Sequence, residues 1–208
     1  MKVLVACEIS GVIRDTFRQR GHDAWSCDIL PNTASPYHIQ GDAIETMHSA
    51  DWDLVIAHPP CTFLCNSGAK WYYDPSDKHL PVDKRRPHPD YPNRLEERRK
   101  AVDFFLDFVH YAHATNVKMC IENPIGFMSN WQKPTQIIQP WQFGHTAAKA
   151  TCLWLYNLPK LQPTNIVKPV YITTPSGKRH NPWYSNNKKM RSVTFQGIAD
   201  AMASQWGT

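Results

Sequence analysis

Residues 54–57 form a short apolar run that restricts the possible folds more than any other part of the chain, because it stops at Pro59 and Pro60. The run lacks helical spacing, and proline cannot continue a strand ladder, so the pattern predicts a buried strand followed by a stiff turn. Ligands bind at the carboxyl ends of strands in open α/β sheets. Cys61 is therefore placed for chemistry, although a small buried thiol would give the same local pattern.

Similar short runs alternate with segments whose apolar residues recur at helical spacing. The predicted strands are residues 3–6, 24–27, 54–57, 117–121 and 150–155. The predicted helices are residues 12–20, 94–114 and 197–206. This alternation predicts an α/β protein with a mostly parallel sheet flanked by helices. The long helix would connect neighbouring parallel strands, so Cys61 and Glu122 should lie side by side.

The 208 residues are expected to form one domain, because no repeat or linker divides them. Two stretches lack the pattern of a core. Residues 66–93 are predicted to be a long loop that mixes prolines, aromatic residues and cations, and it is either a functional lid or a solvated excursion. Residues 157–190 form a short basic segment with little periodicity.

The composition argues against several classes of protein. The six cysteines contain no CxxC pair and the ten histidines are dispersed, so we expect reduced thiols and no metal. The first apolar run is too short for a signal peptide or a membrane span, so we expect a cytoplasmic protein without a membrane partner. The net charge of +5 permits a polyanionic partner without establishing one.

Acidic residues follow two of the expected strand ends. Asp28 lies close to the separation from the first turn at which nucleotide-binding βαβ units place the acid that takes ribose hydroxyls. Asp42 follows Gly41 and is also expected just after a strand. The spacing of Asp28 therefore indicates a ligand that contains a nucleoside.

Taken in order, these features resemble the DNA cytosine-5 methyltransferases, in a compact, phage-like form. The resemblance rests on the first turn with Gly11, the later acid, Gly-Asp, Pro-Pro-Cys, Glu-Asn-Pro and the C-terminal helix, and it runs through nearly the whole chain. It implies a Rossmann-like, S-adenosylmethionine-dependent methyltransferase fold in the cytoplasm of a bacterium or a phage-infected host cell. The implied substrate is DNA or a cytosine nucleotide.

The resemblance also implies roles for individual residues. Cys61 is similar to the family's nucleophile, Glu122 to the acid that holds the target base, and Lys149 to one of two arginines in a Gln-x-Arg-x-Arg stretch. Asp28 would take the ribose and Asp42 would lie near the adenine amino group. The full set implied for S-adenosylmethionine is Ala6, Glu8, Ser10, Gly11, Asp28, Ile29, Asp42 and Pro59.

The chain also departs from the family pattern. The Gly-rich first motif survives only as Gly11, with Glu8 and Ser10 where small residues are usual, and Thr151 replaces the second arginine. The stretch between residues 155 and 191 is too short for a separate target-recognition domain. Contacts to nucleic acid would therefore fall to the loop at 66–93 and to a group of C-terminal cations. These cations are Lys178, Arg179, Lys188, Lys189 and Arg191.

In the chemistry that the resemblance implies, the Cys61 thiolate adds to cytosine C6 and makes C5 nucleophilic toward the methyl group. A protonated or proton-sharing Glu122 at N3 and Lys149 near O2 would stabilise the charge that develops. A Glu122 that stays neutral near pH 7 would have to be partly desolvated. His58, where the family usually has a small residue, would lower the pKa of Cys61 or point away from it.

Two other functions remain open. The same chemistry could act on a free pyrimidine nucleotide or a single strand, because a recognition domain is missing. The chain could instead be a non-catalytic nucleic-acid or cofactor binding protein, although binding alone would need neither Cys61 nor Glu122. The sequence predicts no oligomeric state.

Overall fold

The computed structural model describes residues 1–177, 179–182 and 193–208. Its core is a seven-stranded sheet of order β3-β2-β1-β4-β5-β7-β6, in which β1 to β5 are parallel and β7 is antiparallel to both β5 and β6. Its strands are β1 (Lys2–Ala6), β2 (Asp23–Asp28), β3 (His38–Gln40), β4 (Leu54–Ala57), β5 (Lys118–Pro124), β6 (Gln136–Ile138) and β7 (Thr151–Tyr156). The predicted mostly parallel α/β sheet is confirmed.

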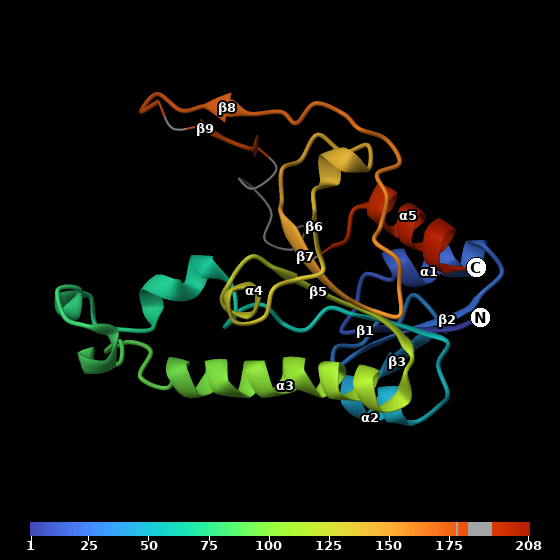
Figure 1. Ribbon diagram of the computed structural model, residues 1–208, viewed down its shortest axis with the longest axis horizontal. Coiled ribbons are helices and arrows are strands. Elements are labelled where there is room, and N and C mark those ends of the chain that lie inside the picture. The colour runs from blue at the N-terminus through green and yellow to red at the C-terminus, as the bar shows by residue number, and fades with distance from the viewer. Residues whose placement is uncertain (178, 183–192) are drawn as a thin grey trace.

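Helices cover both faces of this sheet. The helices are α1 (Val12–Gln19), α2 (Ala43–His48), α3 (Arg94–Thr115), α4 (Phe127–Trp131) and α5 (Gln196–Trp206). Helices α1 and α5 lie on one face, and α2 and α3 lie on the other (Figure 1). In β1, Val3 and Val5 pack toward α1 and α5, whereas Leu4 packs toward α2 and α3. Because both faces are covered, the strands read as continuous apolar runs.

The pairing of β4 with β5 decides where the functional groups lie. Leu54 pairs with Lys118 and Ala57 pairs with Ile121, so both strands reach the carboxyl edge of the sheet together. Cys61 follows the end of β4, and Glu122 lies in β5 one residue beyond the last pair. The prediction that the two strands are neighbours is confirmed.

Residues 66–93 contain more structure than the predicted loop. They form three short 3-10 helices, η1 (Asn66–Trp71), η2 (Pro75–Asp77) and η3 (Val82–Lys84), and they extend past the N-terminal end of α3 (Figure 1). The buried carboxylate of Asp77 accepts hydrogen bonds from the backbone and guanidinium of Arg86, at 2.9 and 3.0 Å. Sequence periodicity could not show this, because the contacts join side chains across a non-repeating segment.

The short elements escaped prediction. Sequence periodicity did not predict α2, α4 or β6, because these elements have only six, five and three residues. A further 3-10 helix, η4 (Pro140–Gln142), precedes β7, and a hairpin of β8 (Ile172–Thr173) and β9 (Arg179–His180) lies in the predicted basic segment. Of the five C-terminal cations, Arg179 is in β9, and Lys178, Lys188, Lys189 and Arg191 lie outside the described residues.

Two searches of the described residues found nothing. None of the helices there has the length and apolar character that crossing a membrane requires. The same part of the chain contains no group of three or more His, Cys, Asp or Glu side chains that could bind a metal ion.

Candidate active site

Cys61 lies on a turn that begins where β4 ends. The backbone N–H of His58 still donates to the Ala6 carbonyl of β1, at 3.0 Å, and the prolines that follow end the ladder. Beyond them, the N–H groups of Leu64 and Cys65 both donate to the carbonyl of Cys61, each at 2.9 Å. This turn holds Cys61 exposed at the carboxyl edge of the sheet.

The end of β5 clamps this turn from the side. The buried Asn123 donates through Nδ2 to the carbonyl of Pro59, at 2.8 Å, and the N–H of Phe127 donates to the carbonyl of Leu64, at 2.6 Å. A Cβ atom on Gly126 would overlap the Leu64 carbonyl oxygen. The Glu-Asn-Pro stretch therefore supplies both the candidate acid and the brace that fixes the turn of the candidate nucleophile.

Glu122 forms a pair with His58 across the two strands. His58 Nδ1 lies 3.0 Å from Glu122 Oε2, and the side chains are only 14% and 21% exposed. Burial alone would raise the pKa of Glu122, but the hydrogen bond and charge of His58, with the charge of Lys149, outweigh it and lower the pKa. The contact with His58 therefore favours an ionised Glu122 in the free protein, and the sequence did not show that His58 faces the carboxylate.

The thiol of Cys61 has a pKa above its ordinary value. Neighbouring protein atoms displace water from it, and the charges of Cys65 and Glu122 add to the increase, while Lys149 acts in the opposite direction. His58 is engaged with Glu122 and does not lower the pKa of Cys61. The structure thus brings Cys61, Glu122 and Lys149 within electrostatic reach of one another, as the predicted catalytic set requires.

A small cavity of about 30 Å³ adjoins this set. His58, Glu122, Lys149 and Thr151 line its polar side, and residues 193–195 and apolar residues from β6, β7 and α5 line the rest. The volume suits a water molecule but not a pyrimidine ring. A larger hollow of about 330 Å³ lies between residues 145–147 and 193–196, at the start of α5. It touches none of the predicted catalytic residues.

The predicted cofactor residues lie at the ends of β1, β2, β3 and β4, and several are used by the protein itself. The buried Glu8 accepts from the N–H of Ile13, at 3.0 Å, and from the hydroxyl of Ser10, at 3.1 Å, so its carboxylate caps α1. The carbonyls of Ala6 and Pro59 accept from His58 and Asn123. Glu8 thus occupies a helix N-terminus that would otherwise suit an anion.

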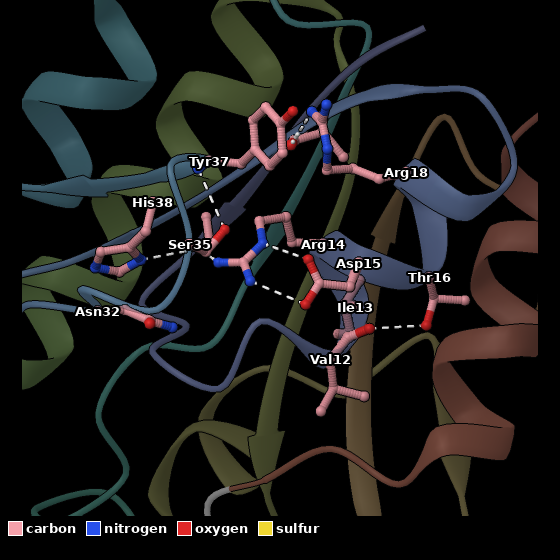
Figure 2. A network of polar contacts seen from close by, with 12 residues as sticks. Val12, Ile13, Arg14, Asp15, Thr16, Arg18, Asn32, Ser35, Tyr37 and His38 are labelled. Atoms are coloured by element: carbon pink, nitrogen blue, oxygen red, sulfur yellow. Dashed lines mark hydrogen bonds and ion pairs between the residues drawn. The ribbon is translucent and has the colours of Figure 1, made fainter.

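Gly11 is required by a side chain of this protein. It has φ of 74°, and a Cβ there would overlap the guanidinium of the buried Arg14. Arg14 forms two hydrogen bonds with Asp15 (Figure 2). It forms a third with Ser26 Oγ, at 2.8 Å. Ser26 in turn contacts Nδ1 of His38, whose Nε2 lies 3.0 Å from the carbonyl of Leu30. This chain of contacts connects α1 to the turn after β2.

Asp28 and Asp42 both lie close enough to Cys7 to act on its thiol, so they share one part of the sheet edge. Burial is the largest cause of the raised pKa of Cys7, and the two carboxylates raise it further. Oδ1 of Asp28 accepts from the N–H of Leu30, at 2.9 Å. Asp42 caps α2, and its Oδ1 accepts from the N–H groups of Ile44 and Glu45, at 2.7 and 3.1 Å. Among the described residues, each carboxylate accepts these hydrogen bonds through Oδ1, which leaves Oδ2 for a ligand.

The adenosine half of S-adenosylmethionine fits these residues better than the methionine half. Ile29, directly after Asp28, is 72% exposed and Ile9 is 40% exposed, so apolar surface lies beside the carboxylate that would take the ribose hydroxyls. A flat apolar base and a polar sugar suit such a pairing. The carboxylate of Glu8, by contrast, takes the place at α1 where a ligand carboxylate could bind.

Comparison with known proteins gives no further identification. A scan against protein-family models finds no match to this chain, and a search of curated proteins finds none either. Sequence reasoning missed the roles of His58 and Asn123. The only available signal was their place within the Pro-Pro-Cys and Glu-Asn-Pro stretches, and it did not show which residues they contact.

Proposed function

We propose that this protein transfers a methyl group from S-adenosylmethionine to C5 of cytosine in DNA, through a covalent bond to Cys61. The observation that carries the proposal is the juxtaposition of Cys61 and Glu122 at the ends of neighbouring parallel strands, with Asn123 bonded to Pro59. A nucleophile and an acid on one rigid edge are what addition to a pyrimidine ring needs. The mostly parallel, helix-flanked sheet is compatible with a Rossmann-like fold.

The residues have distinct tasks in this reaction. The Cys61 sulfur gives its electron pair to ring C6, and the displaced π electrons increase the electron density at C5 and on the N3 and O2 side of the ring. Lys149 and a proton delivered through Glu122 stabilise that charge. S-adenosylmethionine, when bound, supplies the methyl group on a positively charged sulfur. After C5 has gained the methyl group, its proton passes to solvent water, and the Cys61 sulfur leaves with its electron pair.

The charge distribution supports a polyanionic substrate. Residues 1–65 carry four Lys and Arg against eight Asp and Glu, whereas residues 66–208 carry 19 against ten. The net charge is therefore −4 in the first part and +9 in the second. We expect the second part to contact phosphates, with strong salt dependence and shallow sequence preference.

The decisive experiment offers methyl-labelled S-adenosylmethionine together with duplex DNA, single strands, RNA or free dCMP. Label at C5 of cytosine in duplex DNA supports the proposal. Label in dCMP or in single strands alone would instead favour the alternative substrates, a free nucleotide or a single strand. These alternatives are worth testing because a two-stranded β8–β9 hairpin stands in place of a recognition domain. A protein that binds cofactor or DNA but labels no pool would be a binding protein.

A second arm tests Cys61 directly. DNA containing 5-fluorocytosine should trap a covalent adduct on the wild type, because fluorine at C5 blocks the elimination that frees the enzyme. Cys61→Ser should give neither adduct nor turnover, and it should still bind cofactor. Cys65→Ser is the matched control and should trap normally, because only the backbone of Cys65 bonds to Cys61, while its sulfur contacts the hydroxyl of Ser67. An adduct on Cys61→Ser, or methylation of an exocyclic amine without an adduct, would overturn the proposal.

A further inference from the structure

His58 and Lys149 both act on Glu122, and the proposed reaction gives a task to Lys149 but leaves the role of His58 open. Its backbone is fixed by the bond to Ala6 on one side and by Pro59 on the other. The imidazole therefore has a defined direction, toward β5. Nδ1 must carry a proton in the contact with Glu122 Oε2, because an ionised carboxylate only accepts hydrogen bonds.

The other ring nitrogen faces away from Glu122. His58 Nε2 is buried and has no hydrogen-bond partner among the described residues. His58 also lines the cavity of about 30 Å³, which is large enough for the water molecule that a protonated Nε2 would need. The site can therefore accommodate both the neutral and the charged imidazole.

We propose that His58 is a positioning residue for Glu122, which fixes the direction of the carboxylate and holds the proton that Glu122 passes to the substrate ring. This inference rests on the proposed function. In the reaction, the His58 imidazolium gives its Nδ1 proton to the carboxylate, and the carboxyl group gives a proton to ring N3. His58 is then neutral, Glu122 is ionised, and the ring has gained one proton. The proton returns when the Cys61 sulfur leaves.

The charged and titratable groups that face the His58–Glu122 pair come from several elements. Lys149 faces Glu122 from the segment before β7, Cys61 from the turn after β4, Cys120 from β5 and Cys152 from β7. Burial raises the pKa of all three thiols, that of Cys152 to about 11. Glu122 titrates below its ordinary range. Imidazole is the side chain that ordinarily changes charge between pH 5 and 8.

The test compares methylation rates between pH 5.5 and 8 for the wild type, His58→Gln and His58→Ala. Glutamine can still donate to Glu122 but cannot hold a proton. Between pH 5.5 and pH 7.5, we expect the methylation rate of His58→Gln to fall by a factor about ten times larger than the factor by which the wild-type rate falls. Parallel pH profiles at any reduced rate would mean a merely structural role. His110→Gln, on the exposed face of α3, is the matched control and should follow the wild type.

A second measurement does not depend on activity. Nitrogen NMR of histidine-labelled protein should show Nδ1 of His58 protonated in the free protein, with the signal assigned by its loss in His58→Gln. A neutral His58 protonated at Nε2 with a bare Nδ1 would overturn the pairing even if the variants fail to fold. A wild type that neither methylates cytosine nor traps 5-fluorocytosine refutes the proposed function itself. An active wild type with parallel pH profiles refutes only the role of His58.

Discussion

The carboxyl edge of the sheet has two halves that satisfy their polar groups in different ways. After β1, β2 and β3, the carboxylates of Glu8, Asp28 and Asp42 accept hydrogen bonds from residues two to six positions further along the chain. After β4 and β5, the contacts His58 to Glu122 and Asn123 to Pro59 each join residues 64 positions apart. The first half can be assembled turn by turn, whereas the second exists only when β4 and β5 pair in register.

The difference has a consequence for how each half responds to change. A local turn keeps its shape when a neighbouring strand shifts, because its partners move with it. A clamp between two strands transmits any shift directly to Cys61. We therefore expect substitutions in the β4–β5 half to affect both stability and chemistry, and those in the β1–β3 half to affect mainly the binding of cofactor.

The largest effect is expected for Gly126→Ala. The added Cβ would overlap the Leu64 carbonyl, which is backbone and cannot rotate away. We expect a loss of about 3 kcal/mol in the free energy of unfolding and failure of adduct trapping. Gly41→Ala at the other half is the control, because its Cβ would meet no atom closer than 3.9 Å. Denaturant unfolding measures the stability of both variants. Equal stabilities would contradict the inference that the end of β5 clamps the turn that holds Cys61.

Asp28→Ala should weaken S-adenosylmethionine binding by about 1.5–3 kcal/mol, the usual range for hydrogen bonds to a charged group. Because Asp28 also accepts from the N–H of Leu30, Asp28→Asn is the informative companion: it can keep that turn contact and removes only the charge. Calorimetry measures the affinity of both variants. Unchanged affinity in Asp28→Ala would place the cofactor elsewhere.

Asn123→Ala removes the hydrogen bond that joins the two strand ends and leaves the Pro59 carbonyl without its partner. We expect a loss of about 1–2 kcal/mol in stability together with slower adduct formation by Cys61. Asn130→Ala, on the exposed part of α4, should change stability by less than about 0.5 kcal/mol. If adduct formation stays at the wild-type rate in Asn123→Ala, the brace does not position the nucleophile.

The smallest effect concerns pH. Because the pKa of Glu122 is lowered in the folded state, its contribution to stability is present above the usual value of 4.5 and is lost as the pH falls through the folded-state pKa. Thermal unfolding of wild type and Glu122→Gln at pH 7 and pH 3 measures this. The wild type should lose more stability on acidification than the variant. The reverse order would show that Glu122 is neutral in the free protein.

The sequence by itself determined the strands β1, β2, β4 and β5, the long helix α3 and the presence of Cys61 and Glu122 at adjacent strand ends. These features follow from local patterns: apolar runs buried on both faces, helical spacing, and prolines that stop a strand. The capping acids are also local, yet the sequence assigned Asp42 only to a ligand and missed that it caps α2, because that helix has six residues.

Only the tertiary structure decided which side chains meet. His58 was expected to act on Cys61 or to point away, and it instead faces Glu122, because the register of β4 against β5 brings the two residues together. The same register pairs Asn123 with Pro59 and lowers the pKa of Glu122. A contact between residues 64 positions apart leaves no periodic signal in the chain, so the charge of the candidate acid could be known only once the sheet was assembled.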